Sequence, residues 1–292
     1  MSETITVASE AMATRFEVAI HGAPPAVILR AAAEEALEEI ARLESILSLF
    51  QPTSEIAHIN ERAAHEPVPV LPELLTLLLR CHSLHAETDG AFDITIAPLM
   101  RCWRFMNDTG AVPSDDAIAA ALTYTGMQHV NLDEKRCTVS LEKEGVMLDL
   151  GSIGKGYALE QAAALLVENE FENFLIHGGT STVYAHGTQA DGASWRVAVD
   201  HPDESNPPLQ IVDLKNESLS VSGIDGKSFV DNEGNEQGHV IDPRTGRPTQ
   251  VARVAAVICE SATESDAWAT ALLVNPALIP PSHIRVCDQI NS

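Results

Sequence analysis

The amino-acid sequence predicts a fold that mixes helices and strands, with a helix-rich first half and a sheet-rich second half. Apolar residues recur every three or four positions in long segments before residue 90. After residue 170, short apolar runs separated by polar turns dominate the chain. Neither a low-complexity linker nor a shift in composition divides the 292 residues, so we expect a single domain spanning residues 1–292.

The charge of the chain restricts the functions it can have. Lysine and arginine together number 18, aspartate and glutamate 42, and the formal net charge is −24. Nucleic acids and anionic lipid surfaces would be repelled by such a chain, so we expect neither as a general partner. A small ligand or a divalent cation fits this charge better, and an anionic ligand would need a local positive group.

The cysteines and the apolar segments favour neither a disulfide framework nor a membrane protein. Five cysteines are widely spaced and form no Cys-x-x-Cys pair, which argues against disulfides and a zinc site. No apolar run approaches 18 residues, and the first residues lack the basic and apolar pattern of an export signal. The sequence as it stands therefore predicts a cytoplasmic protein without an integral membrane segment.

The first elements follow from local periodicity. Residues 12–20 alternate enough to predict a strand, and the turn at residues 22–25 separates it from a long amphipathic helix that ends near Leu47. Ser54 is a candidate N-cap of a short helix. A second apolar helix is expected from about Pro72 to Ala86.

Histidine and aspartate side chains near that second helix have two possible interpretations. His82 and His85 lack neighbouring cysteine or carboxylate ligands, so we interpret them as surface or boundary residues. Asp93 lies in an apolar setting where a carboxylate needs a partner. It either caps local backbone N–H groups or meets a ligand hydroxyl or amine.

Strands and one more helix are predicted in the second half. The apolar runs predict strands at residues 174–179, 182–186, 195–200, 209–214, 218–222 and 251–259. A helical pattern covers residues 261–274. Asp266 and Thr270 are four positions apart on it, so both oxygens can face one cation, although an N-cap carboxylate and a back-bonded threonine would have the same spacing.

A glycine-rich segment, Val146 to Ala158, is the strongest candidate for a ligand site. Apolar residues lead into it, glycines at 151, 154 and 156 interrupt it, and a helical pattern follows. The expected order is strand, tight turn and helix N-terminus. Exposed backbone N–H groups there, together with Lys155, would suit an anion such as phosphate.

Two well-known phosphate loops do not account for this segment. A P-loop requires glycine five positions before Gly154 and serine or threonine after Lys155, where this chain has Asp149 and Gly156. The dinucleotide-binding fingerprint has glycine spacings of two and then three, whereas the spacings here are three and then two. The local sequence leaves two interpretations open, an anion site or a structural turn with a solvated lysine.

Taken together, these segments resemble the ApbE family of flavin transferases, Mg²⁺-dependent enzymes that move FMN from FAD onto a protein Ser or Thr. Each motif is weak by itself, but their joint occurrence in the family's order is highly specific. The matching segments are Met12-Ala-Thr14, Ser48-Leu-Phe50, Ser54-Glu55, Asn60, Gly90-Ala-Phe-Asp93, Pro98-Leu99, Trp103, Asp149 to Ala158, Gly178-Gly179, Ser222-Gly223, His239 to Gly246, Asp266 and Ala269-Thr270.

The resemblance implies a T-fold-like α+β architecture, in which antiparallel sheets pack with helices around a flavin cleft. It implies Mg²⁺ held by the backbone carbonyl of Ser152 and the side chains of Asp266 and Thr270, which are hard oxygen ligands. It also implies a set of FAD contacts: Met12, Phe50, Ala91, Phe92, Asp93, Asp149, Lys155, Val240 and Ile241.

The implied reaction transfers FMN from FAD to a Ser or Thr hydroxyl of an acceptor protein and releases AMP. Mg²⁺, held in part by Asp266, would neutralise the diphosphate together with Lys155. His239 is the candidate to take the proton of the attacking hydroxyl. Two alternatives remain open: hydrolysis of FAD to FMN and AMP, and flavin binding without catalysis.

The chain departs from the family's pattern at several positions. Thr180 follows the Gly-Gly pair where Asp is common, and Ile224 follows Ser-Gly where an aromatic residue is common. The motifs span residues 12–274, and the tail at 275–292 is atypical. Family members are often exported, so a periplasmic or membrane-anchored location is the alternative to the cytoplasmic one. The identity of the acceptor and the oligomeric state stay open.

Overall fold

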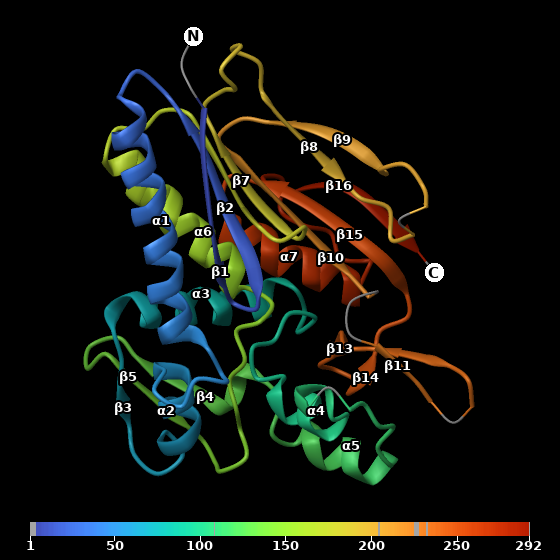
Figure 1. Ribbon diagram of the computed structural model, residues 1–292. Helices are drawn as coiled ribbons and strands as arrows, with labels where there is room; N and C mark the ends of the chain where they lie inside the picture. Colours follow the sequence, from blue (N-terminus) through green and yellow to red (C-terminus); the bar gives the residue numbers. More distant parts are fainter. Residues whose placement is uncertain (1–3, 108, 204, 225–227, 232, 292) are drawn as a thin grey trace.

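A seven-stranded, fully antiparallel sheet forms the centre of the molecule (Figure 1). The computed structural model describes residues 4–107, 109–203, 205–224, 228–231 and 233–291. The strands are, in spatial order, β1 (Thr4–Ala11), β2 (Thr14–His21), β6 (Phe174–Gly178), β7 (Thr182–His186), β10 (Glu217–Gly223), β15 (Ala252–Cys259) and β16 (Arg285–Asn291).

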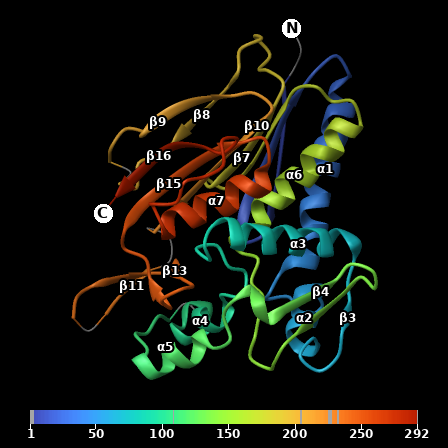
Figure 2. The same ribbon diagram turned by 180° about the vertical axis from the view of Figure 1, so that it is seen from behind.

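Helices cover one face of this sheet, and a β-hairpin covers part of the other. Figure 2 shows α6 (Gly154–Glu168), α7 (Ala262–Val274) and α3 (Pro72–Glu87) in front of the strands, with α1 (Ala26–Leu47) beside them. The hairpin of β8 (Trp195–Val199) and β9 (Gln210–Leu214) packs on the opposite face.

Strand β15 contributes to both layers because successive side chains of a strand point to opposite faces. Ala255 and Val257 join the main core with the helices, whereas Ala256 and Ile258 join the smaller core under the hairpin.

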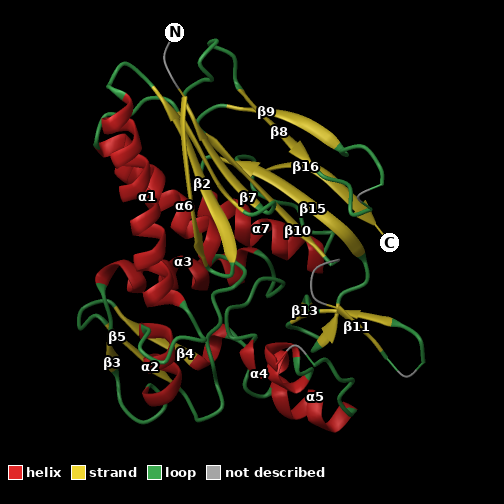
Figure 3. Cartoon of the chain, in the orientation of Figure 1, coloured by secondary structure: helices red, strands yellow, loops and turns green. Residues whose placement is uncertain are grey.

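Two long connections leave the sheet and meet beside it (Figure 3). The first runs from α1 to α6 and carries α2 (Glu55–Arg62), α3, α4 (Ala97–Cys102), α5 (Asp115–Leu122), two 3₁₀ turns (Phe105–Asn107 and Met127–His129), and the small sheet of β3 (Val68–Pro69), β5 (Thr138–Leu141) and β4 (Val130–Asp133). The second joins β10 to β15 and carries β11 (Ser228–Val230), β12 (Glu236–Gly238), β13 (Ile241–Asp242) and β14 (Arg247–Pro248).

A third apolar cluster holds these two connections together. Leu99, Trp103 and Ile118 of the first connection pack with Ile241 of the second. The indole N–H of Trp103 donates to the carbonyl oxygen of Gly246 at 2.8 Å. Because both connections share this cluster, residues from distant parts of the chain line one cavity.

The expected α+β class, with antiparallel sheets packed against helices, is confirmed. The helices expected near residues 72–86 and 261–274 are present as α3 and α7. Ser54 caps α2 as predicted, accepting from the Ala57 N–H at 2.9 Å. None of the described helices is both long and apolar enough to cross a bilayer.

The expectation of a strand from residue 12 is wrong at its start. Met12 and Ala13 both have positive φ angles, 49° and 58°, and form the two-residue turn between β1 and β2. Strand β1 itself was not predicted, because it is an edge strand in which only Ile5 and Ala11 are buried. Its sequence therefore lacks a clear apolar alternation.

The C-terminal tail, atypical by sequence, completes the sheet. Strand β16 pairs with β15 and so forms the second edge of the sheet. Ile284, just before it, is buried in the main core.

Candidate active site

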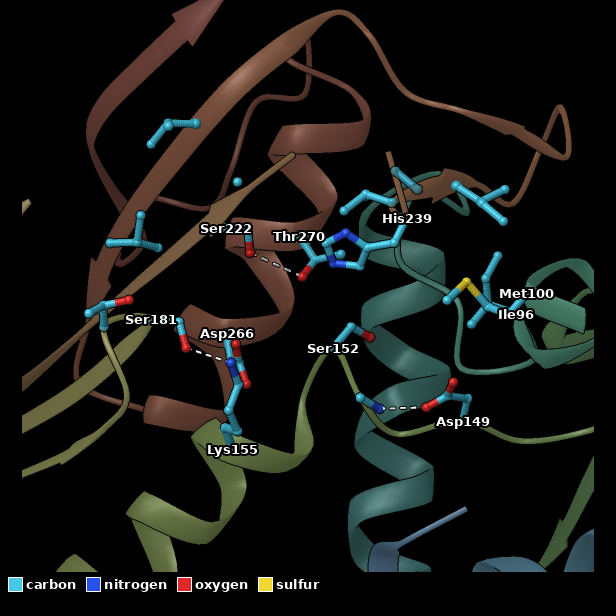
Figure 4. A pocket seen from close by; sticks show the side chains of 18 of the residues that line it. Ile96, Met100, Asp149, Ser152, Lys155, Ser181, Ser222, His239, Asp266 and Thr270 are labelled. Carbon is cyan, nitrogen blue, oxygen red and sulfur yellow. Dashed lines mark hydrogen bonds between the residues drawn. The ribbon is translucent and has the colours of Figure 1, made fainter. Parts of the chain in front are cut away.

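A pocket of about 600 Å³ lies where the two connections meet the sheet. Its walls come from the turn before α6, the β6–β7 turn, the end of β10, helix α7 and the segment before β13. Figure 4 labels ten of the lining residues: Ile96, Met100, Asp149, Ser152, Lys155, Ser181, Ser222, His239, Asp266 and Thr270.

The glycine-rich segment enters this pocket without forming the expected strand. Residues 146–150 have no strand partner. Instead, Asn60 of α2 pairs with the backbone of Leu148: its Oδ1 accepts from the Leu148 N–H at 2.7 Å and its Nδ2 donates to the Leu148 carbonyl at 2.9 Å. A side-chain amide thus replaces the neighbouring strand, which local sequence patterns do not reveal.

Gly156 allows α6 to touch α7. A Cβ at this position would lie 2.1 Å from the Ala262 carbonyl oxygen and 2.7 Å from the Asp266 Cβ. The Gly156 N–H donates to Oδ2 of Asp266 at 2.9 Å. Glycine is therefore needed here for close helix packing, and this packing brings Asp266 to the start of α6.

The expectation that the N–H groups of this turn face a ligand is wrong for two of its glycines. The Gly154 N–H donates to the Leu150 carbonyl at 2.7 Å, and the Gly156 N–H is taken by Asp266. The positive group that the turn offers to the pocket is therefore the Lys155 ammonium.

Lys155 is held by a residue that sequence analysis did not identify. Its Nζ donates to Oγ of Ser181 in the β6–β7 turn (Figure 4). Gly179, two residues earlier, has a φ of 59°, and a Cβ there would lie 2.5 Å from Oγ1 of Thr14. The Gly-Gly motif thus shapes the turn that presents Ser181. The available clue was the position of Ser181 two residues after this motif.

Asp266 is a buried carboxylate, and burial raises its pKa to about 6. The Lys155 charge and the hydrogen bond from the Gly156 N–H have the opposite effect and lower this pKa. Among the described residues none donates a hydrogen bond to its Oδ1. This oxygen is available to a cation, whose charge would favour the ionised form.

Thr270 lies one helical turn after Asp266 and lines the same pocket. Its Oγ1 is 3.3 Å from Oγ of Ser222 at the end of β10. Together with Ser152 of the turn, these residues offer carboxylate, hydroxyl and carbonyl oxygens. Such hard donors fit Mg²⁺, and the buried Asp266 with a free oxygen supports this fit.

Asp149 and Asp93 both accept local hydrogen bonds at the pocket wall. Oδ1 of Asp149 accepts from the Gly151 N–H at 2.8 Å, and burial raises the pKa of this carboxyl. Oδ1 of Asp93 accepts from the N–H and hydroxyl of Thr95 at 2.7 and 2.6 Å. The capping interpretation of Asp93 therefore describes the contacts of its Oδ1.

His85 also contacts Asp93. Its Nδ1 lies 3.3 Å from Oδ2 of Asp93, and this carboxylate is the main cause of a raised His85 pKa. Because the side chain of Asp93 is only 1% exposed, His85 supplies the positive partner that its burial requires.

The predicted FAD contacts divide into two groups. Ala91, Val240 and Ile241 line the pocket with Asp93, Asp149 and Lys155, and Figure 4 shows His239 pointing into it. The other three lie elsewhere. Phe92 is buried in the main core, Met12 packs against that core from the β1–β2 turn, and Phe50 is 72% exposed in a separate depression.

Pocket residues that the sequence did not single out come from turns and from one helix. Asp200, His201 and Pro202 line it from the end of β8, and Ile96 and Met100 form an apolar wall at α4. Two polar residues directly after a strand, Asp200 and His201, were the one clue to the first set. The apolar wall follows only from tertiary packing.

Fold and pocket together define an α+β protein whose ligand site combines a lysine with hard oxygen donors. Residues 12–279 match the model of the ApbE family. The chain belongs to the ApbE family.

Curated relatives of the chain are named FAD:protein FMN transferase. The protein of that name from Klebsiella pneumoniae (strain 342) is 34% identical over 274 residues, which cover 90% of this chain and 76% of the relative. The one from Escherichia coli (strain K12) is 32% identical over 237 residues, with coverage of 79% and 67%. The chain thus falls within a family of enzymes.

Solved structures of the family have the same fold. The ApbE protein of Thermotoga maritima superimposes with a TM-score of 0.85 at 30% identity, covering 93% of this chain and 87% of that one. The apo form of the Pseudomonas stutzeri flavinyl transferase ApbE gives a TM-score of 0.83 at 25% identity, with coverage of 100% and 94%.

Proposed function

We propose that this protein transfers FMN from FAD to a Ser or Thr hydroxyl of an acceptor protein, with Mg²⁺, and releases AMP. The proposal rests on one observation, namely that Lys155 and Asp266 line the same pocket. They provide a fixed positive charge for a diphosphate and a buried carboxylate for a metal ion. The names of the curated relatives supply the flavin substrate.

The pocket residues that would hold Mg²⁺ are Ser152, through its backbone carbonyl, and the side chains of Asp266 and Thr270. When bound, the ion would offset the negative charge of the FAD diphosphate. Lys155, positioned by Ser181, would bind a phosphate oxygen and stabilise the charge that develops on the departing AMP.

The acceptor hydroxyl would attack the phosphorus atom on the FMN side of the diphosphate. The new bond joins the hydroxyl oxygen to this phosphorus, and the broken bond joins the same phosphorus to the bridging oxygen, which leaves with AMP. His239, at the pocket wall, would accept the hydroxyl proton on an imidazole nitrogen. The apolar wall of Ile96, Met100 and Val240 suits the flavin ring.

One incubation separates transfer from its alternatives. The protein is mixed with FAD and Mg²⁺, with and without a candidate acceptor, and followed by intact mass and by AMP release. Transfer adds one FMN to the acceptor and yields equivalent AMP. Hydrolysis releases AMP without attached flavin, and FAD binding without AMP indicates a non-catalytic protein.

The metal assignment has its own test in this assay. Asp266→Ala removes the carboxylate and should abolish metal-dependent transfer, as should a chelator. Full FMN transfer by Asp266→Ala would exclude Asp266 as a metal ligand.

A further inference from the structure

A second depression, of about 430 Å³, is separated from the active-site pocket by helix α4. Leu49, Phe50, Arg101, Arg104 and Met106 line it, and we call these five residues the arginine patch. Met100, the neighbour of Arg101, lines the active-site pocket instead. A molecule bound at the patch would therefore lie next to the site of flavin transfer.

Arg101 and Arg104 are unusual among the arginines of this acidic chain. Nearly all the others in the described part of the chain lie within 4.0 Å of a carboxylate, for example Arg42 with Glu39 and Glu73. Arg101 and Arg104 have no such partner among the described residues, although both are exposed. In a chain with a net charge of −24, two neighbouring guanidinium groups without a carboxylate partner among the residues that the structure describes form a local exception.

The backbone of Arg104 supports a role for its charge. Its φ is +60°, in the left-handed region, directly after the C-cap Trp103 of α4. Glycine usually occupies such a position after a helix, because a side chain there is sterically strained. An arginine kept in this conformation with its side chain in solvent is better explained by a binding role than by stability.

The apolar residues of the arginine patch restrict the kinds of ligand that could bind there. Phe50 exposes 72% of its surface beside the two arginines, with Leu49 and Met106 around it. The guanidinium groups suit carboxylates of a peptide, and Leu49 and Met106 suit an apolar residue next to them. Phe50, which the family resemblance implies as a FAD contact, would place this peptide at the edge of the flavin site.

We propose that the arginine patch docks the acceptor protein through acidic residues near its target Ser or Thr. This inference rests on the proposed flavin transfer. An acidic acceptor would be repelled by the rest of the surface, so Arg101 and Arg104 would fix where and in which orientation it binds. Charge complementarity of this kind determines specificity and register more than total affinity.

The test uses a matched pair of double variants. Arg101→Ala/Arg104→Ala removes the patch charges. Arg30→Ala/Arg136→Ala removes two other exposed arginines, on α1 and in the β4–β5 turn, so its net charge changes equally. The probes are two fluorescently labelled threonine peptides that differ only in having glutamate or glutamine around the threonine, and binding is measured by anisotropy.

The wild-type protein should bind the glutamate peptide about tenfold more tightly than the glutamine peptide, since two exposed charge pairs contribute roughly this factor. The preference should disappear in Arg101→Ala/Arg104→Ala, persist in the control, and shrink with added salt. Equal wild-type affinity for both peptides, or a preference that survives loss of the patch arginines, overturns the inference.

Two further measurements distinguish the inference from the proposed function. FAD affinity, from quenching of flavin fluorescence, should be the same in the wild type and both double variants. A weaker FAD affinity in Arg101→Ala/Arg104→Ala, or displacement of the peptide by AMP, would make the patch a nucleotide subsite and overturn the docking role. Failure of the wild type to bind FAD would contradict the proposed function, whereas peptide preference would still be measurable.

Discussion

At the scale of single residues, Asp266, the proposed metal ligand, would link the protonation of the pocket to metal binding. Its carboxyl has a pKa raised to about 6 by burial, so below that pH the protonated form dominates and is a poor ligand. We expect Mg²⁺ affinity to be constant above pH 7 and about tenfold weaker at pH 5. Calorimetric titration at both pH values measures this, and an unchanged affinity would rule out Asp266 as the titrating ligand.

The same raised pKa predicts an effect on stability without metal. Relative to the unfolded chain, Asp266 contributes stability below pH 4 that is lost as the pH rises through about 6. Asp266→Asn keeps an acceptor for the Gly156 N–H without a buried charge. We expect it to be more stable than the wild type at pH 7.5, by on the order of 1–3 kcal/mol.

Urea denaturation at two pH values tests this expectation. The advantage of Asp266→Asn should vanish well below the ordinary pKa of 3.8, where the wild-type carboxyl is neutral in both folded and unfolded chains. Lower stability of the variant at pH 7.5 would show that the interaction of ionised Asp266 with Lys155 outweighs the effect of burial.

Ser181 is expected to act by positioning Lys155. Ser181→Ala removes the hydroxyl that accepts from Nζ, so the lysine loses its fixed orientation towards the pocket. We expect kcat for FMN transfer to fall tenfold or more, since a hydrogen bond from a charged donor contributes about 1.5–3 kcal/mol, with little change in the KM for FAD. Ser181→Thr keeps a hydroxyl and should retain most of the rate; loss of only FAD affinity would contradict the positioning role.

At the scale of elements, the contact between α6 and α7 determines the geometry of the site. Gly156→Ala would place a Cβ 2.1 Å from the Ala262 carbonyl oxygen, so the two helices must separate. We expect a loss of about 1–3 kcal/mol in the free energy of unfolding and impaired metal binding. Urea denaturation gives the first quantity and metal titration the second.

Gly154 supplies a matched control in the same segment. An added Cβ there would meet only Leu47 Cδ1 at 4.0 Å, an ordinary contact. Because alanine favours a helix more than glycine does, Gly154→Ala should be neutral or slightly stabilising. Equal destabilisation by both substitutions would exclude helix contact as the reason for Gly156.

Several elements could be predicted from the sequence because their determinants are local. Apolar spacing indicated α1, α3 and α7, and Ser54 indicated the start of α2. Strand β1 and the connection at residues 146–150 could not be predicted in this way. The first buries few side chains at the sheet edge, and the second is held by Asn60, far away in the chain.

At the scale of the whole molecule, the pocket joins segments from Ala91 to Thr270 that meet only in the folded chain. A ligand that contacts several of them should therefore stabilise the entire fold. We expect FAD with Mg²⁺ at about 100 times its Kd to add roughly 2.7 kcal/mol of stability and to raise the Tm. A Tm that does not respond to saturating FAD would contradict binding at this pocket.

The sequence by itself determined the family motifs, most helices and the candidates Lys155, Asp266 and Thr270, because spacing along the chain records helix faces and turns. Tertiary structure alone decided which groups meet. It brought Asp266 to the Gly156 N–H, Ser181 to Lys155, and Arg101 and Arg104 beside Phe50. The structure also changes the interpretation of the glycine segment. Its third glycine, Gly156, is needed for the contact between α6 and α7, and its N–H donates to Asp266 instead of to an anionic ligand. Such distances depend on packing between segments up to about a hundred residues apart, which no local pattern encodes.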